Sequence, residues 1–116
     1  MKTVDMMRRH GVEYNILATV NARSAGRGAE VYRFLRSVTD FIQFLPVSEH
    51  VIMEQGAARP HIVPPETEGA VTAPWSISAT AFGEFMCDVF DVWVREDVGR
   101  CFVQLFDATL ANLSLI

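Results

Sequence analysis

Segments with the composition of β-strands alternate with segments whose apolar residues recur at the helical period. Residues 12–20 are rich in β-branched and aromatic side chains and contain neither glycine nor proline, which predicts a strand. A second strand is predicted at 41–45, where Pro46 closes an apolar run, because proline cannot donate to a sheet ladder. The run 101–106 predicts a third strand leading into Asp107. This alternation constrains the fold most, because strands separated by helices pair in parallel.

The predicted helices follow from the spacing of apolar side chains. Residues 4–10 have the character of a helix end, since Gly11 follows where the chain needs a left-handed conformation. Ser78 is suited to cap a long helix that Gly99 ends. A further helix is expected at 108–113. The apolar positions that define the two central helices are Val31, Phe34, Leu35 and Val38 in the first, and Phe82, Phe85, Met86, Val89, Phe90 and Trp93 in the second.

The order of these elements predicts an α/β fold with three parallel strands and flanking helices. Such a fragment is either an arc of a (β/α) barrel, that is a partial barrel, or a piece of a doubly wound sheet. The 116 residues are enough for one domain, expected to span 1–116. Within it, residues 47–78 contain several prolines and glycines and no sustained period, so a long loop is expected there.

Charge and cysteine content restrict the partners and the compartment. The net charge of −4 offers no general attraction to phosphate backbones or anionic lipid, so neither nucleic acid nor a membrane is an expected partner. Two cysteines are too few for the disulfide framework of a small secreted domain. The first ten residues carry four charged side chains instead of an apolar stretch, Lys2, Asp5, Arg8 and Arg9. A cytoplasmic location is therefore expected.

Polar side chains gather where the predicted strands end. Amides and hydroxyls predominate among them, which favours hydrogen bonding of a polar ligand over acid–base chemistry at paired carboxylates. A buried amide such as Gln43 can equally be a satisfied structural group. Glu13 and Asn15 fall on the same strand face as two of these residues, and a polar face in a parallel strand indicates a barrel interior or a ligand. The polar or ring-bearing residues at or just beyond the strand ends are Thr19, Asn21, Gln43, Pro46, Glu49, His50, Gln104, Asp107 and Thr109.

No metal site and no catalytic residue is predicted. The histidines and glutamates of 47–78 match no zinc or iron spacing. Cys87 falls in the long predicted helix and Cys101 begins an apolar strand, so both are expected to be buried, inert thiols. The sequence Gly-Arg-Gly at 26–28 precedes a helix and could cradle phosphate, but the dinucleotide fingerprint needs three glycines at fixed offsets.

Four segments together resemble one family. They are 10–17 (HGVEYNIL), 39–46 (TDFIQFLP), 75–78 (WSIS) and the run from 82 to 110 that includes VQLFD. In combination they resemble the middle of an anaerobic sulfatase-maturating enzyme, a radical S-adenosylmethionine (radical SAM) protein. The resemblance implies a partial (β/α) barrel that holds S-adenosylmethionine and a 4Fe–4S cluster, followed by a SPASM domain with two auxiliary clusters. The enzymes of this family oxidise a sulfatase cysteine or serine to formylglycine.

The resemblance also implies roles for the strand ends. Residues 12–20 would be a late barrel strand that passes the adenosine part of the cofactor, and 41–46 would be the next strand, near the substrate peptide. The chain would then be the C-terminal part of the barrel. The residues implied on the S-adenosylmethionine side are Ile16, Leu17, Thr19 and Asn21, and those implied on the substrate side are Gln43, Pro46, Gln104 and Asp107.

One departure from the family decides what this chain is expected to do by itself. The family's CxxxCxxC motif, whose three thiolates hold the cluster, is absent from these residues, and the SPASM cysteines are absent as well. No cofactor is therefore expected in this chain, which is interpreted as an internal maturase fragment without activity alone. Its implied partner is a sulfatase polypeptide, and exposed strand edges predict association with further copies. A non-catalytic binding module and a structural relic are the alternatives.

Overall fold

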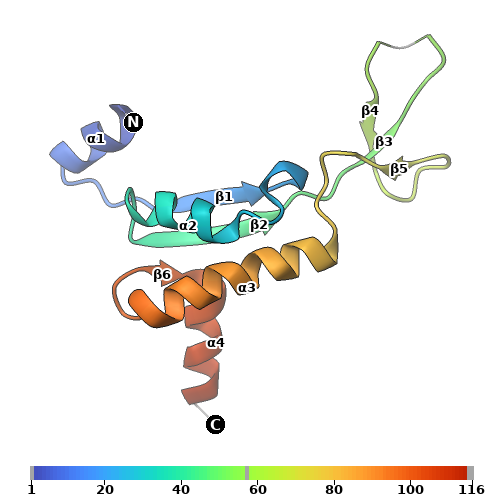
Figure 1. Cartoon of the computed structure of the whole chain (residues 1–116). Coiled ribbons are helices and arrows are strands. Elements are labelled where there is room, and N and C mark those ends of the chain that lie inside the picture. Colours follow the sequence, from blue (N-terminus) through green and yellow to red (C-terminus); the bar gives the residue numbers. More distant parts are fainter. Residues whose placement is uncertain (1, 57, 115–116) are drawn as a thin grey trace.

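Three parallel strands, with helices packed on one of their faces, form the centre of the structure (Figure 1). This computed structural model describes residues 2–56 and 58–114. The elements in chain order are α1 (Lys2–Arg9), β1 (Ile16–Val20), the 3-10 helix η1 (Ala22–Ser24), α2 (Gly28–Arg36), β2 (Phe41–Pro46), β3 (His50–Ile52), β4 (His61–Val63), β5 (Val71–Thr72), α3 (Ala79–Glu96), β6 (Phe102–Val103) and α4 (Gln104–Ser114).

The central sheet has the strand order β1-β2-β6, and both pairings are parallel. Ile16 is aligned with Ile42 in the first pairing, and Phe41 with Phe102 in the second. The predicted α/β class with three parallel strands and flanking helices is confirmed at this level. β2 is the central strand, so β1 and β6 each pair on one side only within the described residues.

Two predicted strands are shorter than expected. The first begins at Ile16 and not at residue 12, because β2 begins only at Phe41, one residue before the partner of Ile16, and offers no partner to residues 12–14. The third was expected over 101–106, but β6 ends at Val103 and α4 begins at the next residue. Val103 and Phe106 are both buried, and a helical turn places these two side chains, three residues apart, in the same core.

The hydrophobic core lies between the sheet and the helices α2 and α3. Trp93 is fully buried at its centre, and its indole Nε1–H donates to the carbonyl oxygen of Cys101 at 2.8 Å. Ser78 caps α3 as predicted, since its Oγ accepts from the amide of Ala81 at 3.1 Å. The other large core side chains, drawn from strands and helices alike, are Val20, Tyr32, Ile42, Phe44, Phe85, Val89, Val103 and Phe106.

The segment 47–78, expected to be a long loop, carries a second small sheet. Its strand order is β4-β3-β5, and both pairings are antiparallel. This sheet projects away from the central one (Figure 1). Its strands are two or three residues long, too short for an alternating pattern to be read from the sequence.

One expected burial is wrong. Cys101 is buried, but Cys87 is exposed. Cys87 lies on α3 next to Met86, which faces the core, and a step of one residue turns the side chain by about 100° around the helix axis. No helix within residues 2–56 and 58–114 has the length and apolar character needed to cross a membrane.

Candidate functional site

The helices cover only one face of the central sheet and leave the other open. Along β1, Leu17 is 59% exposed and Thr19 is exposed, while Val20 is buried. The register places Leu17 beside Gln43 and Thr19 beside Leu45. We call this surface the open sheet face; its residues are Leu17, Thr19, Phe41, Gln43, Leu45 and Phe102. Apolar side chains with one amide and one hydroxyl among them suit an extended polypeptide, which offers both apolar groups and backbone hydrogen-bonding groups.

Backbone hydrogen bonds fix both ends of the segment 47–78 at the carboxyl edge of this sheet. The amide of Val47 donates to the carbonyl of Val20 at 2.8 Å, and the amide of Ile77 donates to the carbonyl of Val47 at 3.0 Å. The amide of Ala22 donates to the carbonyl of Trp75 at 2.9 Å. The carboxyl edge is therefore a fixed junction of three chain segments.

Side chains reinforce this junction. The indole Nε1–H of Trp75 donates to the Glu49 carboxylate at 2.8 Å. The amide of Glu49 donates to the Ser76 hydroxyl at 2.9 Å. Glu49 lies at the strand end as the sequence predicted, and its carboxylate is already engaged in positioning Trp75.

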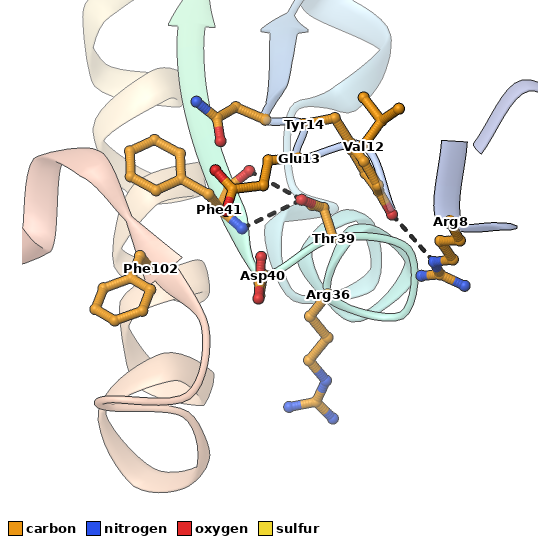
Figure 2. Close-up of a pocket in the computed structure, with 10 residues that line it drawn as sticks. Arg8, Val12, Glu13, Tyr14, Arg36, Thr39, Asp40, Phe41 and Phe102 are labelled. Atoms are coloured by element: carbon orange, nitrogen blue, oxygen red, sulfur yellow. Dashed lines mark hydrogen bonds between the residues drawn. The ribbon is translucent and has the colours of Figure 1, made fainter. Parts of the chain in front are cut away.

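A cavity of about 580 Å³ lies at the amino end of the sheet (Figure 2). It continues the open sheet face, because Phe41 and Phe102 line both. Glu13 and Asn15, predicted to share a strand face, line this cavity from the segment before β1. The other lining residues are Arg8, Val12, Tyr14, Arg36, Thr39 and Asp40.

Hydrogen bonds hold the walls of this cavity. Tyr14 donates from its hydroxyl to the carbonyl of Val38 and accepts from Nε of Arg8 at 3.1 Å. The Thr39 hydroxyl accepts from the amide of Phe41 at 3.2 Å (Figure 2). The cavity lies at the opposite end of the strands from the predicted ligand edge, so the sequence pattern missed Thr39 and Asp40 as lining residues.

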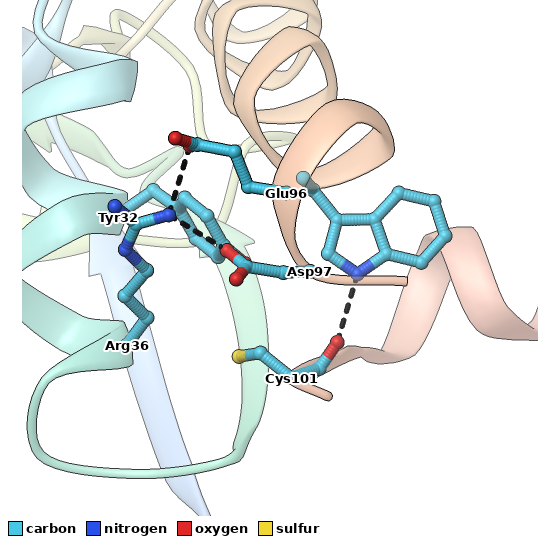
Figure 3. Close-up of polar contacts among 6 residues, drawn as sticks. Tyr32, Arg36, Glu96, Asp97 and Cys101 are labelled. Atoms are coloured by element: carbon cyan, nitrogen blue, oxygen red, sulfur yellow. Dashed lines mark hydrogen bonds and ion pairs between the residues drawn. The ribbon is translucent and has the colours of Figure 1, made fainter. Parts of the chain in front are cut away.

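A buried polar network joins α2 to the end of α3 (Figure 3). The hydroxyl of fully buried Tyr32 donates to the Asp97 carboxylate at 2.7 Å. Nη1 of Arg36 donates to Asp97 at 2.9 Å and to Glu96 at 3.0 Å. Burial alone would raise the pKa of the Asp97 carboxyl, but the hydrogen bonds from Tyr32 and Arg36 outweigh it and hold this pKa below its usual value.

Burial keeps two acidic groups at this network neutral. Burial, helped by the hydrogen bond to Asp97, raises the pKa of the Tyr32 phenol above its usual range. Burial also raises the pKa of the Cys101 thiol. Cys101 is thus a neutral thiol near neutral pH, as expected for an inert structural cysteine.

The free energy of unfolding is expected to fall on both sides of neutral pH. The lowered pKa of Asp97 gives a contribution that is complete above the ordinary value of 3.8 and is lost as the pH falls through the folded-state value. The raised pKa of Tyr32 gives a contribution that is complete below the ordinary value of 10.0 and is lost as the pH rises further. Urea unfolding of wild type and of Asp97→Asn at acidic and neutral pH measures the first effect. A stability difference between the two proteins that stays constant with pH would contradict it.

The structure brings together three of the residues implied on the ligand side. Leu17, Thr19 and Gln43 all lie on the open sheet face. Ile16 is aligned with buried Ile42 and lies on the helix-covered face.

The remaining implied residues lie at element ends. Asn21 Oδ1 accepts from the amide of Arg23 at 3.0 Å and so caps η1. Pro46 is the exposed last residue of β2, and Gln104 is the exposed first residue of α4. Asp107 Oδ2 accepts from the amide of Val103 at 2.8 Å, so this carboxylate fixes the turn from β6 into α4.

Helix packing explains one glycine of the Gly-Arg-Gly sequence at 26–28. A Cβ atom at Gly28 would lie 2.4 Å from the carbonyl oxygen of Phe85, so glycine is needed where α2 approaches α3. Close helix packing thus accounts for the second glycine of the Gly-Arg-Gly sequence.

The part of the chain that the structure describes contains no group of three histidine, cysteine, aspartate or glutamate side chains that could hold a metal ion.

The chain is similar to curated anaerobic sulfatase-maturating enzymes over nearly its whole length. It is 38% identical over 113 residues to the serine-type enzyme of Bacteroides thetaiotaomicron, covering 97% of this chain and 27% of that enzyme. It is 25% identical over 116 residues to the cysteine-type enzyme of Clostridium novyi, with the same two coverages. The serine-type enzyme of Klebsiella aerogenes is 30% identical over 105 residues, which are 89% of this chain and 22% of that enzyme.

The chain therefore spans about a quarter of the length of these relatives. No model of a protein family matches it, and no solved structure matches it.

Proposed function

We propose that this chain, which is homologous to one segment of the anaerobic sulfatase-maturating enzymes, forms the part of a maturase against which a sulfatase polypeptide binds. The observation that carries this proposal is the open sheet face, which exposes Leu17, Leu45 and Phe102 beside the amide of Gln43. Exposed apolar side chains gathered on one face mark interaction surfaces. The serine-type and cysteine-type relatives are named for maturing sulfatases, which suggests the chemical class of the partner.

The arrangement of the sheet suits an arc of a (β/α) barrel. In such a barrel the helices lie outside and the opposite face of every strand points into the interior. α2 and α3 pack on one face of the β1-β2-β6 sheet, so the open sheet face would be the interior one. We therefore propose that residues 1–116 form the C-terminal part of a radical SAM partial barrel, with the segment 47–78 at its carboxyl edge.

The residues present do not fit an iron–sulfur cluster. Such a cluster needs several cysteine thiolates, and the sequence contains two cysteines. Cys87 is exposed on α3, whereas Cys101 is buried before β6. In the proposed maturase the ligands of the cluster, and with them the oxidation to formylglycine, belong to residues outside these 116, while Leu17 and Thr19 would lie on the side of S-adenosylmethionine. The chain alone would then bind without catalysing.

Isothermal titration calorimetry with a sulfatase-derived peptide containing the target cysteine or serine tests this proposal. Saturable heat is expected with the wild-type chain. The double substitution Leu17→Ser with Leu45→Ser should weaken binding by about tenfold, because two partly exposed leucines lose apolar contact with the peptide.

Phe34→Ser is the matched control, because Phe34 is 57% exposed on α2 and lies away from the open sheet face. It should change the affinity by less than about twofold. Absence of saturable heat would reject the binding role and leave the structural relic. Equal weakening by the control would reject the assigned surface. Self-association through the outer edges of β1 and β6, and a cytoplasmic location, stay predictions.

A further inference from the structure

We propose that the cavity between the C-terminal ends of α2 and α3 binds a multivalent oxyanion of the phosphate class. This cavity has a volume of about 730 Å³ and lies outside the open sheet face. Three guanidinium groups and two carboxylates line it, together with one hydroxyl. The residues are Arg33, Arg36, Ser37, Glu96, Asp97 and Arg100.

The guanidinium of Arg36 is held in place by two carboxylates and keeps further N–H groups that can donate to a ligand. Both of its hydrogen bonds to carboxylates, at 2.9 Å to Asp97 and 3.0 Å to Glu96, leave from Nη1. A guanidinium carries five N–H donors, and those on Nε and Nη2 have no acceptor among the described residues. The Tyr32 hydroxyl fixes the Asp97 carboxylate from the other side, so this guanidinium is pre-positioned. Pre-positioned donors lower the entropic cost of binding an anion.

Arg33 and Arg100 bring two further positive charges to the cavity. Both are exposed, and neither forms a salt bridge within residues 2–56 and 58–114. The two carboxylates of the cavity are already paired with Arg36. The lining therefore has one positive charge in excess, although the whole chain has a net charge of −4.

Favourable interaction with the helix macrodipole explains only part of this arrangement. Arg33 and Arg36 lie in the last turn of α2, where cations are stabilised by the helix dipole. Arg100 comes from the turn after α3, so the same effect does not account for its presence at this cavity. Glu96 remains half exposed beside the cavity and repels any anion in proportion to the charge of that anion. The three guanidinium groups outnumber the two carboxylates, so the net attraction is larger for a ligand with two or more negative charges, which favours phosphate-type groups.

Calorimetric titration of the 116-residue chain with inorganic pyrophosphate, at constant ionic strength, tests the proposal. Saturable binding is expected. Arg33→Gln and Arg100→Gln should each weaken it by about tenfold, since each removes a charge-assisted contact. Arg23→Gln is the matched control: Arg23 is an exposed arginine on η1 outside this cavity, and its substitution makes the same change in net charge.

A second titration, with a phosphoserine peptide, distinguishes the two sources of such a group. Tighter binding of the peptide would assign the cavity to a phosphorylated polypeptide, and tighter binding of pyrophosphate would assign it to a small molecule. Either result supports an oxyanion site. Loss of affinity in Arg23→Gln equal to that in the cavity variants would reveal general charge attraction and overturn the proposal. Absence of saturable binding in both titrations would overturn it as well. Circular dichroism of the variants checks that the exposed substitutions leave the fold intact.

Discussion

Replacing Asp97 with alanine is expected to lower the free energy of unfolding by about 3 kcal/mol. The substitution removes the carboxylate that accepts from the Tyr32 hydroxyl, which is fully buried and would keep only the weakly hydrogen-bonding thiol of Cys101 beside it. It also removes one of the two carboxylates that bind Arg36. Because Tyr32 and Asp97 join α2 to the end of α3, the loss weakens contact between two elements that cover the sheet. Urea unfolding monitored by tryptophan fluorescence measures the change.

Glu96→Ala is the control for this prediction. Glu96 binds the same nitrogen of Arg36, but its side chain is 50% exposed, so its loss should cost no more than about 1 kcal/mol. Asp97→Asn keeps an acceptor for Tyr32 and should fall between the two. Similar destabilisation by Glu96→Ala and Asp97→Ala would show that the buried hydroxyl contributes little, contrary to the expectation.

Replacing Gly28 with alanine is expected to destabilise the chain by about 2 kcal/mol. The added Cβ would lie 2.4 Å from the carbonyl oxygen of Phe85 and 3.2 Å from Cβ of Asp88. The nearest obstacle is backbone, so α2 and α3 would have to move apart. This movement would loosen the contacts of Tyr32 and Phe85, which lie fully buried on these two helices. Thermal unfolding followed by circular dichroism provides the measurement.

Gly83→Ala should have the opposite sign. Gly83 lies inside α3, and a Cβ atom there would meet no atom within 4 Å apart from its chain neighbours and the backbone of its own helix. Alanine in a helix interior is favoured over glycine by about 0.5–1 kcal/mol, so this variant should be more stable than wild type. If Gly28→Ala were also stabilising, the close approach of the two helices would not exist in solution.

The elements that could be predicted from the sequence are those in which a local signal and the tertiary packing agree. α3 combines a long apolar period with the Ser78 cap, and β2 ends at Pro46 as expected. β6 could not be distinguished from the start of α4, because residues 101–106 are apolar enough for either structure. The helix from Gln104 onward is favoured only because a helical turn buries Phe106 in the same core as Val103. The strands of 47–78 are stabilised by pairing between residues distant in sequence, which leaves no local period.

The candidate surfaces likewise include residues that a local sequence pattern indicates and residues that depend on tertiary packing alone. Thr19 and Gln43 were found from their positions on predicted strands, and both lie on the open sheet face. The alternation of Phe41, Gln43 and Leu45 with buried side chains could have indicated the rest of that face in β2. No sequence pattern could indicate the bond between Tyr32 and Asp97, which lie 65 residues apart, because it depends on how α2 and α3 pack. The arginine-lined cavity depends on the same packing.

The junction at the carboxyl edge has a consequence for variation in chain length. The amide of Val47 is hydrogen-bonded to the end of β1, and the amide of Ile77 is hydrogen-bonded to Val47. The segment between Val47 and Ile77 therefore leaves the central sheet and returns to it at nearly the same point. Residues added to or removed from the connection between β3 and β4 therefore need not displace any strand of the central sheet, and lengthening such a connection costs little closure entropy. Homologous chains can thus carry connections of very different length between β3 and β4 on an unchanged central sheet. For experimental use, a reporter domain can be inserted into this connection.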